Sequence, residues 1–127
     1  MTYGLSKTTP LPFTAAIDKV TEELRKEGFG ILTTIDVRDT MKKKLDVEFG
    51  NYTILGACNP PFAFRALQAE EQVGLLLPCN VIVYENNGST IVSIFDPMTI
   101  SAVTENPDLL SIAQEIKQKL TRVLQAV

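Results

Sequence analysis

The spacing of apolar and polar positions predicts a strand, a helix and a second strand at the start of the chain. Residues 3–9 have the Thr and Tyr content of a strand. From Phe13 to Leu24 apolar side chains recur at steps of three and four, after Pro12, which suits a first helical turn. Gly28 then stands where a left-handed residue ends a helix. Partial alternation over residues 29–37 predicts the second strand.

A short helix and a third strand are expected next. Either Asp36 or Asp39 can cap a helix over residues 38–45, and Met41 and Leu45 are expected to provide its apolar contacts. Regular alternation over residues 52–58 predicts a strand with one apolar face and one mixed face.

Asn59 followed by Pro60 predicts another helix, because a side-chain cap and a first-turn proline are both typical of helix starts. This helix is expected to reach about residue 69 and to bury Ala63, Ala66 and Leu67. Residues 73–86 then indicate one long strand, joined to a strand over 89–96 by the two-residue turn Asn87-Gly88. An irregular segment follows Asp96-Pro97.

The C-terminal fifth of the chain predicts one long docked helix. Asn106-Pro107 repeats the helix-start signal, and an apolar stripe continues from Leu109 to Val127. The complete order favours a single α+β domain over residues 1–127, with a mostly antiparallel sheet of about five strands, two long helices on one face and short helices in the connections. Apolar side chains point both ways from the long strand, so we expect a homodimer that buries the helix-free face.

Composition excludes several partners. The net charge of −3 and the pI near 4.9 argue against binding to nucleic acid, which requires a basic surface, and the lysines at 42–44 are expected to form a solvated edge. No apolar run approaches the roughly 20 residues that span a bilayer, so no membrane partner is expected. The N-terminus lacks the pattern of a signal peptide, and we therefore expect a cytoplasmic protein with reduced thiols.

The chain contains no histidine, which removes serine and cysteine catalytic triads and the usual ligand sets of zinc enzymes. It also contains neither a phosphate-binding P-loop nor a dinucleotide-binding glycine fingerprint. Nucleotide binding therefore has no supporting motif, and the sequence identifies no particular cofactor.

The only two cysteines lie in two related motifs, Ala-Cys-Asn-Pro at 57–60 and Leu-Pro-Cys-Asn at 77–80. Cys58 precedes a helix start, where the helix dipole lowers a thiol pKa; a buried structural residue, a reactive or metal-binding thiol and a residue that lines a pocket all fit this position. Cys79 follows Pro78, which predicts a bulge or a sheet edge. Two sulfurs without a third ligand make an incomplete metal site.

These motifs, together with Asp96-Pro97, resemble the signature of the family called domain of unknown function 302. The resemblance covers nearly the whole chain. It implies a curved antiparallel sheet similar to the TATA-box-binding-protein-like fold, and dimers among the members. It does not imply DNA binding or any established activity.

Three hypotheses of function follow. The first is a homodimeric domain that binds a small ligand or a metal near the cysteine motifs; the second is an enzyme with Cys58 as a thiolate nucleophile or redox centre; the third is a structural or protein-interaction module. The candidate ligand-binding residues are Cys58, Asn59, Pro60, Pro78, Cys79, Asn80, Asp36 and Asp96, and the candidate metal ligands are Cys58 and Cys79. Asp36 and Asp96 also suit a capping role.

Overall fold

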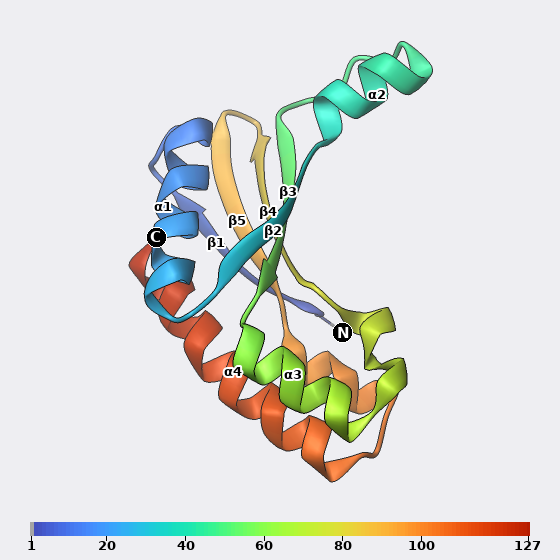
Figure 1. Ribbon diagram of the computed structural model, residues 1–127. Coiled ribbons are helices and arrows are strands. Elements are labelled where there is room, and N and C mark those ends of the chain that lie inside the picture. Colours follow the sequence, from blue (N-terminus) through green and yellow to red (C-terminus); the bar gives the residue numbers. More distant parts are fainter. Residues whose placement is uncertain (1) are drawn as a thin grey trace.

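The sheet is the frame of the molecule (Figure 1). The computed structural model describes residues 2–127 and contains five strands in the order β1-β5-β4-β3-β2, each antiparallel to its neighbours. The strands are β1 (Gly4–Thr9), β2 (Gly30–Asp36), β3 (Tyr52–Cys58), β4 (Cys79–Asn86) and β5 (Ser89–Phe95). The predicted α+β class and the antiparallel sheet are confirmed.

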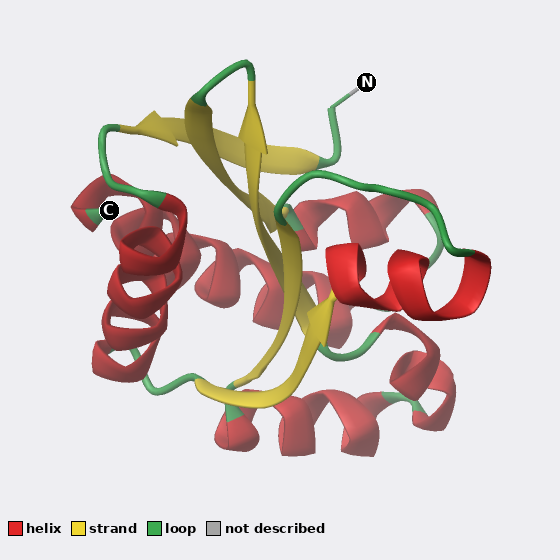
Figure 2. Ribbon diagram, turned by 90° about the horizontal axis from the view of Figure 1, so that it is seen from above, coloured by secondary structure: helices red, strands yellow, loops and turns green. Residues whose placement is uncertain are grey.

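The two long helices pack on one face of this sheet, as predicted, and the shorter helices lie around it (Figure 2). The helices are α1 (Phe13–Lys26), α2 (Val37–Leu45), α3 (Pro60–Ala69) and α4 (Pro107–Ala126), with the 3₁₀ helices η1 (Glu71–Leu76) and η2 (Pro97–Ala102). Asn106 caps α4 by accepting a hydrogen bond from the Asp108 N–H, so the second Asn-Pro signal acts as the sequence predicts.

The core lies between the sheet and the long helices α1 and α4. Val81 of β4 is paired with Leu55 on one side and Ile94 on the other, and all three side chains are buried. Val20 of α1 and Leu120 of α4 are fully buried against this row. Each such side chain contributes about 1.5 to 3 kcal/mol by leaving water, so the alternation of the strands and the helix stripes together define the core.

The opposite, helix-free face of the sheet also carries apolar side chains. Tyr52, Ile54, Ile82, Tyr84 and Ile91 alternate with the core residues and are half-buried. The rings of Tyr52 and Tyr84 stack with centroids 5.4 Å apart. This face therefore has the composition of a surface that packs against another body.

The helix α2 projects beyond the end of the sheet (Figure 1). Asp36 caps it by accepting a hydrogen bond of 3.0 Å from the Asp39 N–H, which agrees with the capping role. The expected packing of Leu45 is wrong, because its side chain is 65% exposed. The helix lies past the strand ends and contacts β2 and β3, but none of its residues is buried.

The predicted strand over residues 73–86 is half wrong. Residues 71–76 form η1, and β4 begins only at Cys79. Pro78 has no N–H for a ladder bond, and it separates the two segments instead of interrupting a strand. The bulge or sheet edge expected beside Pro78 is wrong, because β4 pairs regularly between β3 and β5; the register shift lies in β2, between Ile31 and Thr33.

Two local predictions have different outcomes. The turn Asn87-Gly88 joins β4 and β5 with φ values of 52° and 80°, the left-handed conformation that a two-residue hairpin requires.

In α3 only Ala66 is buried, whereas Ala63 is half-buried and Leu67 is exposed, contrary to expectation. These two side chains border an open cavity.

Candidate functional site

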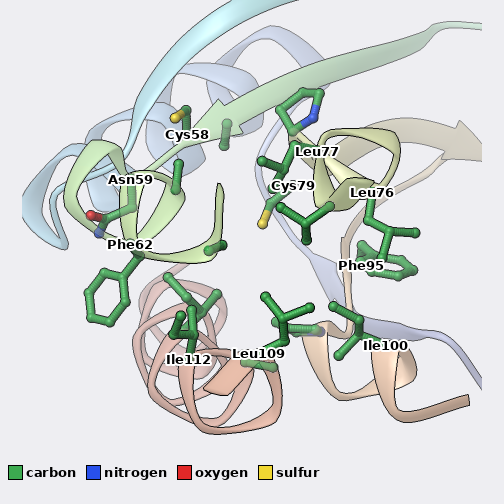
Figure 3. Close-up of a pocket in the computed structure, with 18 of the residues that line it drawn as sticks. Cys58, Asn59, Phe62, Leu76, Leu77, Cys79, Phe95, Ile100, Leu109 and Ile112 are labelled. Atoms are coloured by element: carbon green, nitrogen blue, oxygen red, sulfur yellow. The ribbon is translucent and has the colours of Figure 1, made fainter. Parts of the chain in front are cut away.

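A cavity of about 410 Å³ lies at the end of the sheet where the two cysteine motifs meet the helices. Its walls come from the ends of β3 and β4 and from α3, η1, η2 and α4 (Figure 3). Leu109 and Ile112 of α4 lie opposite Leu77 and Cys79, and Ile100 of η2 closes one side. The volume is within the range of about 300 to 1,000 Å³ that is typical of ligand pockets.

The wall is almost entirely apolar. Among the described residues that line it, only Asn59 and Thr99 have polar oxygen or nitrogen atoms in their side chains, and the only titratable groups are the two thiols. No Asp, Glu, Lys or Arg of residues 2–127 lines the cavity. The wall can exclude water and bind apolar surface, but it provides no acid or base of ordinary strength.

Cys79 is the thiol inside the cavity. It is the first residue of β4 and pairs with Ala57, which is buried on the helix-covered face. Its sulfur points into the space between the sheet and α4 (Figure 3). Burial, with a smaller contribution from the nearby Cys58, raises the pKa of the Cys79 thiol from its usual 9.0 to about 11. The group is a neutral thiol at physiological pH and is therefore a poor nucleophile.

Cys58 lies near Cys79 but points elsewhere. It is the last residue of β3, next to Ala57, and successive strand residues face opposite sides of a sheet. Figure 3 shows its sulfur directed away from the cavity. Both cysteines are free thiols. Among residues 2–127, no group of three or more Cys, His, Asp or Glu side chains is arranged to hold a metal ion.

Asn59 has a structural role that differs from the predicted cap. Its side chain makes no capping hydrogen bond to α3; instead its Nδ2 donates to the carbonyl oxygen of Glu27, at 3.1 Å. This bond joins the end of α1 to the start of α3. Gly28 has φ of 89°, and a Cβ there would lie 3.1 Å from Asn59 Nδ2, so a side chain at residue 28 would be strained and crowded.

Pro78 belongs to the cavity wall and also contacts the middle of the sheet. Gly56 of β3 lies between Pro78 and Thr33 of β2, and a Cβ on Gly56 would collide with the Thr33 hydroxyl and come within 2.9 Å of the Pro78 ring. Only glycine leaves room for this contact. Asn80 and Pro60 are exposed and do not line the cavity.

The two candidate aspartates lie outside the cavity wall. Asp36 caps α2 at the far end of β2 and β3. Asp96 caps η2 by accepting a hydrogen bond of 3.0 Å from the Met98 N–H, and its other carboxylate oxygen pairs with Lys117 at 3.0 Å. The structure thus brings Cys58, Asn59, Pro78 and Cys79 to one wall and leaves Pro60, Asn80, Asp36 and Asp96 away from it.

Most of the cavity wall has no individual sequence signal. Leu109, Ile112 and Ile116 belong to the apolar stripe of α4 and read as ordinary core positions. The same holds for Leu76, the last residue of η1, and for Val103, just after η2, which border the cavity and are exposed.

The family profile described as domain of unknown function DUF302 matches residues 5–127. The chain belongs to this family. A solved structure with the same architecture is the crystal structure of an uncharacterized conserved protein DUF302 from Bacillus stearothermophilus. It is 29% identical, with a TM-score of 0.92, over 99% of this chain and 98% of that chain.

The DUF302 match confirms the resemblance inferred from the cysteine motifs and brings no assigned activity. A comparison with curated proteins gave no match. Within residues 2–127, none of the helices combines the length and the hydrophobicity that a bilayer crossing requires.

Proposed function

We propose that this DUF302 protein binds a small apolar molecule in the cavity beside its two cysteine motifs. The observation that carries the proposal is a cavity of about 410 Å³ whose wall has no charged side chain among the described residues. Ligand pockets combine such apolar walls with a few polar groups that orient the ligand. Here Thr99 and the neutral thiol of Cys79 can fill that orienting role.

The wall also defines the chemistry of the ligand. A carboxylate or an ammonium group placed inside would lose its hydration and meet no opposite charge, at a cost of several kcal/mol. At about 30 Å³ for each non-hydrogen atom, the volume suits a neutral molecule of roughly a dozen such atoms. A charged part of a larger ligand would have to stay at the cavity mouth.

The metal and enzyme hypotheses have less support. A metal ion would find a buried thiol of high pKa and a second thiol on the other side of the sheet. A thiolate mechanism at Cys58 would find no proton donor or acceptor in the wall, apart from Cys79. Native mass spectrometry of the purified protein, described below, would also reveal a bound metal ion or a covalent adduct on Cys58.

The proposal includes a homodimer and a cytoplasmic location. The apolar helix-free face, with Ile54, Ile82 and Tyr84, supports association, and the two free thiols fit a reducing compartment. The net charge of −3 gives no support to a nucleic-acid partner.

Binding is tested with N-phenyl-1-naphthylamine, a neutral apolar dye that fluoresces when it leaves water, and by native mass spectrometry of the purified protein. Ala63 lines the cavity, so Ala63→Leu adds volume inside it with little change in helix propensity. We expect at least tenfold weaker dye binding. The matched control is Ala126→Leu, at an exposed position of α4, which should bind as the original protein does. Absence of dye binding in all three proteins, or equal binding in all three, would contradict the proposal.

A further inference from the structure

Two exposed apolar areas lie at opposite ends of β2 and β3. The first, which we call the arm, is the segment 37–49, formed by α2 and the extended residues after it. The second, which we call the mouth, is the exposed part of the cavity wall: Leu32, Leu67, Leu76 and Val103. Leu32 and Val103 are 67% and 69% exposed, so the mouth is open to solvent.

The arm packs loosely on the rest of the chain: α2 contacts β2 and β3, and the Phe49 ring meets the Tyr52 ring edge to face, with centroids 6.1 Å apart. None of the nine residues of α2 is buried, and Leu45, Val47 and Phe49 expose large parts of their side chains. Isolated helices shorter than about 12 to 15 residues are marginal in water and depend on packing of their apolar side. The arm therefore has the properties of an element that is stabilised by contact with another molecule.

The total surface agrees with this interpretation. A folded monomer of 14.0 kDa is expected to expose about 6,700 Å². The chain exposes 7558 Å², which is roughly 900 Å² more. A standard interface buries about 800 Å² on each partner, so the excess is of the same order as one side of such an interface.

The arm and the mouth lie near opposite ends of the helix-free face. Figure 1 shows α2 beyond one end of β2 and β3 and the yellow-green segment η1 near the other end, both on the right of the view, with α1 on the left. Between them, Ile35, Ile54 and Ile82 form an apolar row across three neighbouring strands of the helix-free face. A body placed against that row would meet the arm at one end and the mouth at the other.

We propose that this body is a second copy of the chain, related by a twofold axis that runs across the strands, so that the arm of each copy covers the mouth of its partner's cavity. Such an axis reverses the strand direction and brings the arm end of one copy to the mouth end of the other. This inference rests on the proposed function in one respect: the covered cavity is the ligand site, and the partner's Leu45 completes its wall.

The charges of the two areas are complementary. The arm has four cationic side chains against three anionic ones, and Lys44 has no carboxylate partner among the described residues. Two segments carry the mouth residues Leu76 and Val103. These segments, 70–76 and 97–108, contain Glu70, Glu71, Glu105 and Asp108 and no Lys or Arg. The same carboxylates would repel the anionic surface of a bilayer, so a membrane is the less suitable occupant.

The first test separates arm contacts from other contacts by sedimentation equilibrium. The double variant Leu45→Asp/Val47→Asp changes only exposed side chains of the arm and should raise the dimer dissociation constant at least tenfold. The control is Phe64→Asp, an exposed aromatic residue of α3 outside the cavity wall, which should leave that constant unchanged. Circular dichroism confirms the fold of each variant. A monomeric unsubstituted protein, or a dimer that the arm variant leaves intact, overturns the inference.

The second test determines which surfaces meet. Equal amounts of the variants Leu45→Cys and Val103→Cys are mixed and oxidised. A disulfide between the two variants, identified by mass spectrometry of the linked peptides, is expected because the arm of one copy lies over the mouth of the other. A link only between two Leu45→Cys copies would place the arms side by side and overturn the inference.

The two proposals can fail separately. Links between arm and mouth without any binding of N-phenyl-1-naphthylamine would support the dimer geometry and contradict the ligand site. Dye binding with an affinity that the arm variant does not change, in a protein without arm-to-mouth links, would support the ligand site and overturn the covering by the arm.

Discussion

The cavity predicts an unusual alkaline behaviour of Cys79. Burial raises the pKa of this thiol from 9.0 to about 11, so the folded state holds the proton more strongly than the unfolded chain does. The stabilisation that results is fully present below pH 9 and is lost as the pH rises from 9 through 11. Replacing Cys79 with Ala removes the titrating group and should remove this part of the pH dependence.

The size of the effect follows from the two pKa values. Between pH 8 and pH 11 the free energy of unfolding should fall by about 2 kcal/mol through Cys79 alone, because one pKa unit corresponds to about 1.4 kcal/mol. At pH 8 the thiolate fraction should be about 100-fold lower than that of a thiol with the usual pKa. The fall in unfolding free energy and the low thiolate fraction have the same cause, the burial of Cys79 in the apolar wall.

Urea denaturation at several pH values checks the first number. Other groups titrate in the same range, so the relevant quantity is the difference in unfolding free energy between the protein and its Cys79→Ala variant. Labelling by a thiol-reactive chromophore in a Cys58→Ser background checks the second, since Cys79 is then the one thiol of the chain. A difference that stays constant from pH 8 to 11, or labelling with an inflection near pH 9, would refute the burial of Cys79 in an apolar cavity.

Three substitutions test the framework around the site by chemical denaturation. Gly56→Ala should destabilise by about 1 to 3 kcal/mol, because its Cβ collides with Thr33 and Pro78, and adding Thr33→Ala should recover part of the loss. Asn59→Ala should cost about 1 to 3 kcal/mol, because the carbonyl of Glu27 loses its donor; Asn80→Ala, at an exposed position, is the control and should change little. Asp36→Ala should cost about 1 kcal/mol by removing the cap of α2, and an unchanged stability would show that the helix does not depend on it.

Local sequence signals were sufficient for most elements. The Asn87-Gly88 turn determines how β4 and β5 pair, since few other residues adopt two successive positive φ values. The helix that starts at Pro60 was also predicted from Asn-Pro, although the reason was partly wrong: Asn59 bonds to Glu27, 32 residues away in the sequence, instead of its own helix. The Asn-Pro pair therefore marks where the helix starts, but it does not reveal which group the Asn59 side chain bonds to.

The run Val73 to Leu77 shows why part of the fold was not predictable. A short apolar run fits a buried strand and a buried helical turn equally well, and only the three-dimensional surroundings select one of them. In this protein the run forms η1, with Val73 buried and Leu76 at the mouth of the cavity. The cavity itself depends on the segments 29–32, 57–67, 73–79, 95–103 and 109–116, which converge from distant parts of the sequence, and no local pattern encodes this convergence.

The position of β1 imposes an order on folding. Gly4 pairs with Phe95, and the ladder between β1 and β5 closes at Thr9 and Thr90, so β1 must wait for a segment that is synthesised 81 to 91 residues later. Contacts between residues so far apart are slow to form because a long loop has to close first. On the ribosome, β2 and β3 can pair before β5 is synthesised, whereas β1 stays unpaired until β5 has left the exit tunnel.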